Sequence, residues 1–368
     1  MKNTLITFIA FVLVALSVAC APAPTVTPTI PPAPTVAPTI LPAPTIAPTI
    51  PPTPTIAPTS VPPTVPPPAA TQPPATAANP TAAAPVDFVW KIKGGSSPLV
   101  LPNGLALDQQ GNLYVVDSGN SRIVKFDSNG KFLLEWGSHG NADGQFDFPD
   151  DYASVAVDAQ GNVYVTDDTN ARIQKFDSNV KFLTKWGKSG TGDGEFTLPI
   201  GVAIDKAGSV YVADENAVRI QKFDSNGRYL SKWGSRGSGD GQFNSPLSIV
   251  FDGQGNVYVA DYGNGRIEVF SNDGKFLSKW DIHCGTGQHP LMAPVGVAID
   301  GQGNVFIADN ANSRVCEFDS RGQFLSTWGS EGVANGQFFS ATGIAADQQN
   351  NIYVSDHITN SIQKFRLR

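Results

Sequence analysis

The segment Gly111 to Asp117, with the sequence GNLYVVD, recurs five more times along the chain and decides its fold. The other copies are GNVYVTD, GSVYVAD, GNVYVAD, GNVFIAD and NNIYVSD, and they end at Asp167, Asp214, Asp261, Asp309 and Asp356. Successive copies lie 50, 47, 47, 48 and 47 residues apart. Because a repeat with a period of roughly 20 to 50 residues is typical of stacked structural units, each copy marks one such unit.

Each repeat contains four strand-like pieces. In the first repeat they are Gly104 to Asp108, Leu113 to Val116, Arg122 to Phe126 and Lys131 to Trp136, separated by turns rich in Gly, Asn and Asp. Apolar and polar residues alternate along the pieces, which predicts antiparallel β-strands rather than helices. A four-stranded sheet with two apolar faces is buried when such sheets stack radially, so the sequence predicts an all-β fold, a β-propeller.

The tryptophans give the number of blades. All six occupy one position of the repeat: Trp90, Trp136, Trp186, Trp233, Trp280 and Trp328. The sixth copy ends at Arg368 without a fourth strand, whereas the segment Val86 to Lys91, which carries Trp90, is a fourth strand without a blade. We therefore expect six blades over residues 86–368, with the N-terminal strand closing the last blade and removing its free edge.

The recurring string Gly-Asn-hydrophobic-Tyr-Val-x-Asp, followed by Asn-x-Arg-Ile, resembles the repeat of the NHL family over residues 86–368. The resemblance implies a six-bladed propeller. Members of this family serve as protein- or RNA-binding modules, as extracellular sensor domains of bacterial receptor kinases, or as the α-amidating lyase. The resemblance therefore implies a fold and a range of functions, not one activity.

Residues 1–20 have the pattern of a signal peptide: Lys2, an apolar run from Leu5 to Leu16, and small residues before Cys20. The run is shorter than the roughly 20 residues that a membrane span needs. The sequence Leu16-Ser17-Val18-Ala19-Cys20 also resembles the lipobox of bacterial lipoproteins, which implies lipidation of Cys20. Simple secretion after cleavage at the same site is the alternative.

Residues 21–85 form a low-complexity segment that contains 23 of the 30 prolines and no charged residue. Proline favours extended polyproline II and cannot join a sheet, so we expect a disordered stalk between an envelope anchor and the propeller. The chain is thus predicted to be exported and to meet a membrane only through Cys20.

The charge of the chain argues against nucleic acid as a partner. Apart from Lys2, all charged residues lie within residues 86–368, where 24 basic residues face 32 acidic ones. A phosphate-binding surface needs clustered Lys and Arg, which this balance does not provide.

Most recurrent polar residues have a structural explanation. The Asp that ends each second strand is expected to cap the following turn and to pair with the Arg five residues later, as in Asp117 and Arg122. The Asp at the end of each first strand, such as Asp108, belongs to a hairpin turn. The six Trp are expected to pack between blades.

The sequence shows no catalytic residue set and no cofactor or metal site. The four His are His139, His283, His289 and His357. Only His357 directly follows the Asp that ends a second strand, so three inward-facing His ligands for zinc cannot be assembled from this set. The six residues expected around the axis, Asn103, Ala153, Ile200, Leu247, Val295 and Thr342, predict a small and mostly apolar channel.

Two places break the symmetry. A longer connection before the second blade carries Asp150, Asp151 and Tyr152, and the connection before the fifth blade carries Cys284. Cys284 and Cys316 are the only cysteines after Cys20, and two Cys in an exported domain suggest a disulfide, although the sequence leaves open whether they lie close enough.

The first hypothesis is a non-catalytic, surface-tethered module that binds an unknown protein, peptide or glycan on one rim of the propeller. Its candidate contacts are the variable residues of that rim: Asp150, Asp151, Tyr152, Asp168, Glu215, Tyr262, Asn310 and His357. The alternative is a metal-dependent lyase or hydrolase that acts at the axial mouth.

Overall fold

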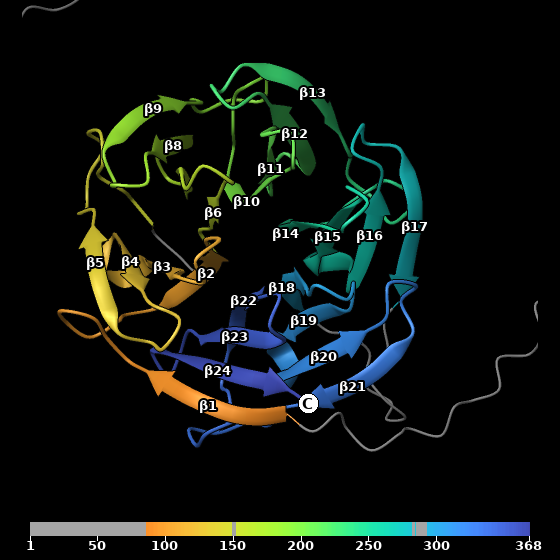
Figure 1. Ribbon diagram of the computed structural model, residues 1–368. Helices are drawn as coiled ribbons and strands as arrows, with labels where there is room; N and C mark the ends of the chain where they lie inside the picture. The colour runs from red at the N-terminus through yellow and green to blue at the C-terminus, as the bar shows by residue number, and fades with distance from the viewer. Residues whose placement is uncertain (1–85, 149–151, 282–283, 285–292) are drawn as a thin grey trace, which may run out of the picture. The chain divides into compact units, whose positions relative to one another are not determined.

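The computed structural model of the chain describes residues 86–148, 152–281, 284 and 293–368. The signal segment, Cys20 and the stalk lie outside these ranges, as do Asp150, Asp151, His283 and His289. In the described ranges, 24 strands form six four-stranded antiparallel sheets arranged around a central axis, which confirms the predicted six-bladed propeller (Figure 1).

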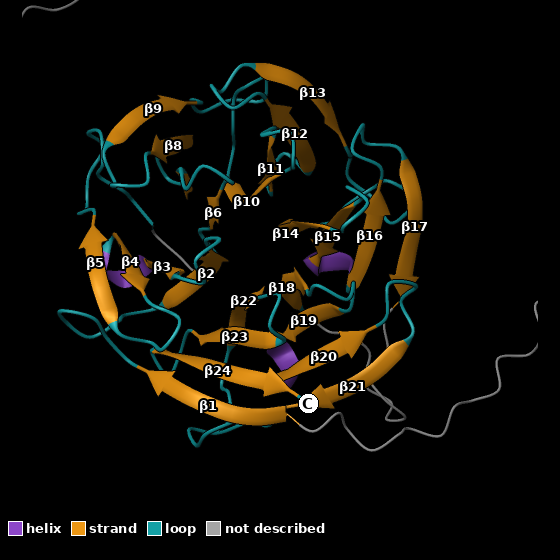
Figure 2. Cartoon of the chain, viewed as in Figure 1, coloured by secondary structure: helices purple, strands orange, loops and turns teal. Residues whose placement is uncertain are grey.

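Every blade runs from an inner strand at the axis to an outer strand at the circumference (Figure 2). Blade 1 consists of β2 (Pro102–Leu107), β3 (Leu113–Asp117), β4 (Arg122–Phe126) and β5 (Phe132–Trp136). Blade 2 consists of β6 (Val155–Val157), β7 (Val163–Asp167), β8 (Arg172–Phe176) and β9 (Phe182–Trp186). Blade 3 consists of β10 (Pro199–Ile204), β11 (Val210–Asp214), β12 (Arg219–Phe223) and β13 (Tyr229–Trp233).

Blades 4 to 6 follow the same order. Blade 4 consists of β14 (Pro246–Phe251), β15 (Val257–Asp261), β16 (Arg266–Phe270) and β17 (Phe276–Asp281). Blade 5 consists of β18 (Pro294–Ile299), β19 (Val305–Asp309), β20 (Arg314–Phe318) and β21 (Phe324–Trp328). Blade 6 consists of β22 (Ala341–Ala346), β23 (Asn351–Asp356), β24 (Ser361–Leu367) and the N-terminal β1 (Val86–Ile92). Three single-turn 3₁₀ helices follow second strands: η1 (Ser118–Asn120), η2 (Tyr262–Asn264) and η3 (Asn310–Asn312).

The N-terminal strand closes the ring as the tryptophan positions predict. Strand β1 pairs with β24 from Val86 opposite Leu367 to Ile92 opposite Ile362. Blade 6 therefore combines both ends of the folded chain, and no blade is left with three strands.

The core lies between the blades. The second strands are buried on both faces, and Tyr114, Tyr164, Tyr211 and Tyr353 are among the largest fully buried side chains. The tryptophans join neighbouring blades: the ring of Trp136 lies 6.3 Å from that of Tyr114 in its own blade and 5.8 Å from that of Phe176 in the next. These edge-to-face contacts confirm that the tryptophans pack between blades.

The propeller has two distinct faces. The face that we call the upper face carries the turns between second and third strands and the connections from one blade to the next. The lower face carries the other turns, where Asp108 Oδ1 accepts hydrogen bonds from the backbone N–H groups of Gln110 (3.0 Å) and Asn112 (2.9 Å), as expected for this Asp. Because β24 runs away from the upper face, Val86 at its far end joins the propeller at the lower face. No helix in the described ranges is long and apolar enough to cross a membrane.

Candidate functional site

The Asp that ends each second strand is a structural residue of the upper face. In blade 3, Asp214 is fully buried, and its Oδ1 accepts hydrogen bonds from the N–H groups of Thr197 (3.0 Å) and Leu198 (2.9 Å). Its Oδ2 lies 3.1 Å from Arg219 Nη2. The same ion pair recurs in four other blades, as Asp117–Arg122, Asp167–Arg172, Asp261–Arg266 and Asp309–Arg314. In blade 6, Ser361 stands at the Arg position, and Asp356 accepts backbone N–H bonds from Phe339 and Thr359.

The residue after this Asp is different in every blade and points toward the connections of the upper face. Ser245 Oγ donates to Glu215 Oε1 at 2.5 Å, and Asn310 Nδ2 donates to Ser340 Oγ at 2.8 Å. Both contacts reach the beginning of the next blade. The candidate residues therefore lie on one face, held by neighbouring blades, although they are not drawn into a single cluster.

Two pairs of residues meet near the upper end of the axial channel, where Tyr152 and Asn103 belong to its lining. The rings of Tyr152 and Tyr262, from blades 2 and 4, lie 6.4 Å apart. On the other side, His357 Nδ1 lies 3.2 Å from Asn103 Oδ1, and Asn103 Nδ2 donates to Ser118 Oγ at 2.9 Å. The upper end of the channel thus has one aromatic pair and one polar pair of residues.

Asp168 lies at the predicted position but is not available as a surface contact, because only 3% of its surface is exposed. Burial raises the pKa of its carboxyl to about 7; the N–H of Thr169 opposes this increase, and the charges of Asp167 and Asp147 add to it. The sequence pattern could not separate this buried carboxyl from the exposed ones. Asp150 and Asp151 lie outside the described residues.

The axial channel has a volume of about 330 Å³. Five of the six residues expected to line it do so, and Tyr152 takes the place of Ala153. Ile200, Leu247 and Val295 form an apolar cluster against which Tyr152 and Leu198 pack. Among the described residues, the lining contains no Asp, Glu, Lys, Arg, His or Cys side chain, so these residues provide no acid–base pair and no set of strong metal ligands there.

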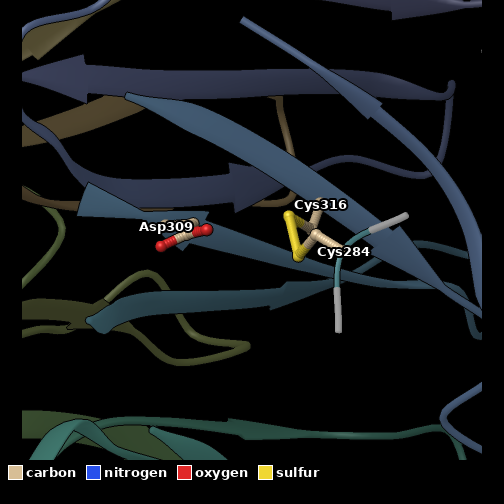
Figure 3. Close-up of side chains that lie close together, drawn as sticks. All are labelled: Cys284, Asp309 and Cys316. Atoms are coloured by element: carbon tan, nitrogen blue, oxygen red, sulfur yellow. A yellow bond between two sulfur atoms is a disulfide. The ribbon is translucent and has the colours of Figure 1, made fainter. Parts of the chain in front are cut away.

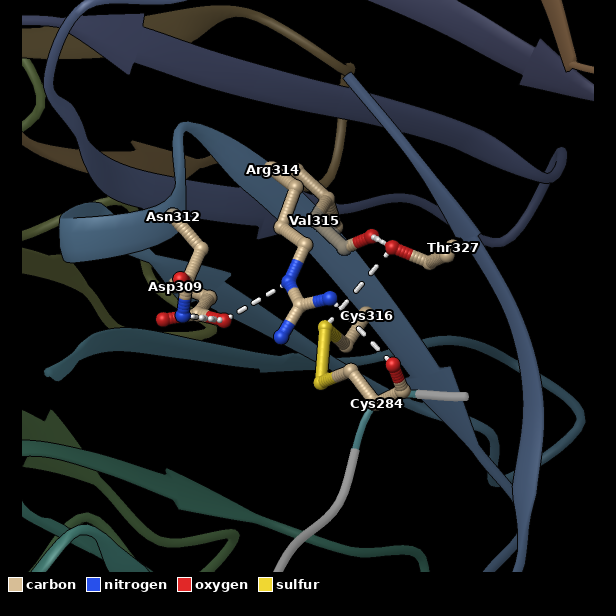
Figure 4. Close-up of a disulfide and its surroundings, with 7 residues drawn as sticks. All are labelled: Cys284, Asp309, Asn312, Arg314, Val315, Cys316 and Thr327. Carbon is tan, nitrogen blue, oxygen red and sulfur yellow. Dashed lines mark hydrogen bonds and ion pairs between the residues drawn. A yellow bond between two sulfur atoms is a disulfide. The ribbon is translucent and has the colours of Figure 1, made fainter. Parts of the chain in front are cut away.

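Cys284 and Cys316 form a disulfide with an S–S distance of 2.09 Å and a Cα–Cα distance of 5.9 Å (Figure 4). Both residues are buried. Arg314 Nη1 donates to the carbonyl oxygen of Cys284 at 3.2 Å, and Thr327 Oγ1 donates to that of Val315 at 2.9 Å. The bond connects blade 5 to the segment that precedes it.

Asp309 lies beside the two cysteines, with the donor atoms of all three within 4.8 Å of one another (Figure 3). The sulfurs are bonded to each other and offer no thiolate. Asp309 Oδ2 is bound by Arg314 Nε (2.8 Å) and Asn312 Nδ2 (2.8 Å), as the equivalent Asp is in blades 1 and 4. This group is therefore part of the blade structure and not a metal site in this form.

Sequence reasoning named Tyr152, Tyr262, Asn103 and His357 but did not pair them. One signal was present: Tyr152 stands where blades 1, 3, 4 and 5 have Pro102, Pro199, Pro246 and Pro294. A large ring at a position that elsewhere holds proline marks a departure from the blade pattern.

The fold and its repeat define the class of protein: a six-bladed β-propeller with an Asp–Arg pair in five of its blades. Five segments match the NHL repeat, at residues 99–126, 153–176, 196–223, 243–270 and 291–318. The chain belongs to the NHL-repeat propellers. The search of curated proteins found no match.

Solved structures with the same fold include enzymes. A streptogramin B lyase is 16% identical, with a TM-score of 0.52, over 78% of this chain and 90% of that chain. A catalytically inactive virginiamycin B lyase from Staphylococcus aureus, with quinupristin, is 12% identical, with a TM-score of 0.55, over 77% of this chain and 100% of that one. A gluconolactonase from Xanthomonas campestris is 15% identical, with a TM-score of 0.52, over 77% and 89%. Similarity at this level shows the fold alone.

Proposed function

We propose that this protein is an exported, surface-tethered recognition module without catalytic activity, which binds a protein, peptide or glycan on its upper face. One observation carries the proposal. Six equivalent positions, each directly after the Asp that ends a second strand, hold six different side chains: Ser118, Asp168, Glu215, Tyr262, Asn310 and His357. Ser118 and Asp168 are buried, so the other four, which are at least partly exposed, form the surface. A purely structural position would repeat, as the Asp does, whereas variation confined to one face is typical of a surface that binds an irregular partner.

The position of Val86 is consistent with the upper face as the binding surface. Val86, the first described residue, lies at the lower face, opposite the face that carries the candidate contacts. A proline-rich stalk that follows a lipidated Cys20 holds the domain at the cell envelope. Lipidation is tested by incorporation of radiolabelled palmitate into the wild-type chain and into Cys20→Ala. Equal labelling of the two chains, or membrane attachment of Cys20→Ala, contradicts the anchor.

A pull-down from envelope extract tests recognition. The bait is the wild-type chain, the upper-face variant Glu215→Ala/Asn310→Ala, or the lower-face control Gln110→Ala/Gln160→Ala, whose side chains are exposed. We expect one set of partners to be retained by the wild type and the control and lost from the upper-face variant. Equal retention by all three chains contradicts the upper face as the binding surface.

A metal-dependent lyase or hydrolase is the second candidate. The similarity in fold to two lyases and a lactonase favours it, together with the position of His357 beside Asn103 at the upper end of the channel. Such an enzyme needs a set of metal ligands, and the channel lining offers only hydroxyl and amide oxygens. Metal analysis of the purified chain decides between the two: stoichiometric zinc or calcium contradicts the first proposal as stated.

A further inference from the structure

The central channel is not filled by the side chains around it. Its lining consists of the six inner strands, β2, β6, β10, β14, β18 and β22, together with the residues just before β6, and it encloses about 330 Å³. Protein interiors are otherwise packed with few voids larger than a water molecule. The volume is roughly twice that of a 150 Å³ apolar cavity that stays dry and binds benzene. The channel is therefore large enough for a small organic molecule.

The channel narrows toward the upper face because glycines bring the inner strands together there. A Cβ on Gly201 would lie 2.1 Å from Leu247 O, and one on Gly343 would lie 2.1 Å from Asn103 O. Gly104 N also donates to Ala153 O of the next blade at 3.2 Å. The side chains at this end, such as Asn103, Leu247 and Thr342, are 2% exposed or less. Because Tyr152 and Leu198 also pack against Ile200, Leu247 and Val295, we infer that side chains fill the upper end of the channel.

The lower end is apolar. The last residue of each inner strand is aliphatic or aromatic and only half-buried, and together these residues form a ring around the axis: Leu107, Val157, Ile204, Phe251, Ile299 and Ala346. Partial exposure of six equivalent apolar side chains leaves apolar surface in contact with solvent, which is unfavourable unless it is covered. The channel thus opens toward the lower face through an apolar ring.

The polar groups of the wall are bound within the protein. Ser248 Oγ accepts a hydrogen bond from Val297 N at 3.2 Å, and Thr342 Oγ1 lies 3.0 Å from Ser355 Oγ. No side chain of the lining carries a charge at neutral pH. A charged ligand would lose its hydration without gaining a partner, whereas an uncharged apolar one gains from burial.

We propose that the central channel is a binding site for a small, uncharged molecule with an aliphatic or aromatic body, which enters from the lower face. This site is separate from the upper face proposed for recognition. Its selectivity comes from uncharged walls and limited volume rather than from hydrogen bonds. The volume is at the lower end of the range of roughly 300 to 1,000 Å³ that ligand pockets span.

Calorimetric titration of the full chain with 1-hexanol, hexanoate and hexylammonium tests the proposal. The three probes share one aliphatic body and differ in charge. We expect saturable binding of one equivalent of 1-hexanol, and binding of the two ions that is weaker by about tenfold or more, because the walls do not compensate a buried charge. Absence of saturable 1-hexanol binding, or equal binding of hexanoate, overturns the proposal.

A variant of the apolar ring locates the site. Ala346→Phe introduces the side chain that blade 4 carries at the equivalent position, Phe251, and Ala346→Leu introduces that of blade 1, Leu107. We expect Ala346→Phe to weaken 1-hexanol binding by about tenfold or more and Ala346→Leu to weaken it less, because each fills part of the channel. If thermal unfolding shows that Ala346→Phe does not fold, the binding of 1-hexanol to Ala346→Leu tests the proposed location instead. Unchanged binding in a folded variant overturns the proposed location.

The upper-face variant Glu215→Ala/Asn310→Ala, whose side chains contact Ser245 and Ser340 and not the channel lining, separates this proposal from the recognition function. It should bind 1-hexanol like the wild type even where it loses its partner in the pull-down. Loss of 1-hexanol binding in this variant contradicts a channel entered from the lower face.

Discussion

Blades 3 and 5 bind the connection from the preceding blade in different ways. In both blades the residue that binds it occupies the same position of the third strand. In blade 3, Gln221 Oε1 accepts a hydrogen bond from Gly194 N (3.0 Å), and its Nε2 donates to Glu195 O (2.7 Å). In blade 5 the equivalent residue is Cys316, which is bonded to Cys284. A covalent bond in blade 5 therefore stands where blade 3 has a pair of hydrogen bonds.

The arginine of each blade shows that the two connections correspond. Arg219 Nη1 donates to Thr191 O at 2.7 Å in blade 3, and Arg314 Nη1 donates to Cys284 O at 3.2 Å in blade 5. Cys284 therefore takes the place of Thr191. Blades 2 and 6 repeat the pattern of blade 3 with Gln174 and Gln363. In blades 2, 3, 5 and 6, one position of the third strand thus helps to hold the connection from the preceding blade.

Removal of the disulfide is expected to have the largest effect. The bond closes a segment with a sequence separation of 32 residues. The loss of chain entropy that such a bond causes in the unfolded state predicts that Cys284→Ser/Cys316→Ser lowers the free energy of unfolding by about 3–4 kcal/mol. Urea unfolding with and without reductant measures it.

The reductant provides the control for this prediction. It should lower the stability of the wild type to that of the double variant and leave the variant unchanged. If reductant does not change the stability of the wild type, and the double variant is as stable as the wild type, the disulfide does not stabilise blade 5.

The sequence predicted the features that repeat. Strand positions, the closing role of Trp90 and the Asp–Arg pairs all followed from residues that recur at fixed intervals, because each copy is independent evidence for the same local geometry. Strand β1 could be assigned to blade 6 because Trp90 is a tryptophan without a blade of its own.

The sequence did not predict contacts between blades that involve residues which do not recur in every repeat. The burial of Asp168, the pairing of Tyr152 with Tyr262 and the narrowing of the channel arise where residues of different repeats meet in three dimensions. The spacing of residues along the chain places each of them on a face, but it does not state how close two faces come. The candidate site was therefore predicted as a list of positions and not as a geometry.

Blade 4 offers a third arrangement, and it is expected to depend on pH. Glu268 replaces the glutamine there and is fully buried, with Arg266 Nη2 at 2.6 Å from Oε1. Neither of its carboxylate oxygens receives a well-aligned hydrogen bond. Burial raises the pKa of Glu268 to about 7, with Arg266 and Lys279 opposing the increase and Asp261 and Asp240 adding to it. Only the protonated form can imitate glutamine and donate to the carbonyl of the preceding connection.

The direction of the pH dependence follows from proton binding. Between the usual pKa of Glu, near 4.3, and about 7, the folded chain holds a proton that the unfolded chain has released. The contribution of Glu268 to stability therefore falls as pH rises through this window and is constant above it, separately from the contribution of Asp168, whose pKa is also raised. Glu268→Gln should remove this decrease, a gain of roughly 2–3 kcal/mol at pH 8 relative to the wild type.

The reciprocal exchange Gln221→Glu should transfer the same decrease to blade 3. Urea unfolding at pH 5 and pH 8 measures both variants against the wild type. If the difference between the two pH values is the same in all three chains, the position does not control the connection through its protonation.

The loss of a single glutamine is expected to have the smallest effect of the series. Gln221→Leu introduces an apolar side chain of similar size. The N–H of Gly194 then loses its acceptor, and Glu195 O keeps only its hydrogen bond from Arg219. Two lost hydrogen bonds predict a decrease of about 2 kcal/mol in the free energy of unfolding. The control is Gln110→Leu, the same substitution at an exposed position of the lower face, for which the expected change is within about 0.5 kcal/mol. Equal effects of the two substitutions would mean that Arg219 holds the connection without Gln221, and that the disulfide of blade 5 adds to the arginine instead of replacing the glutamine.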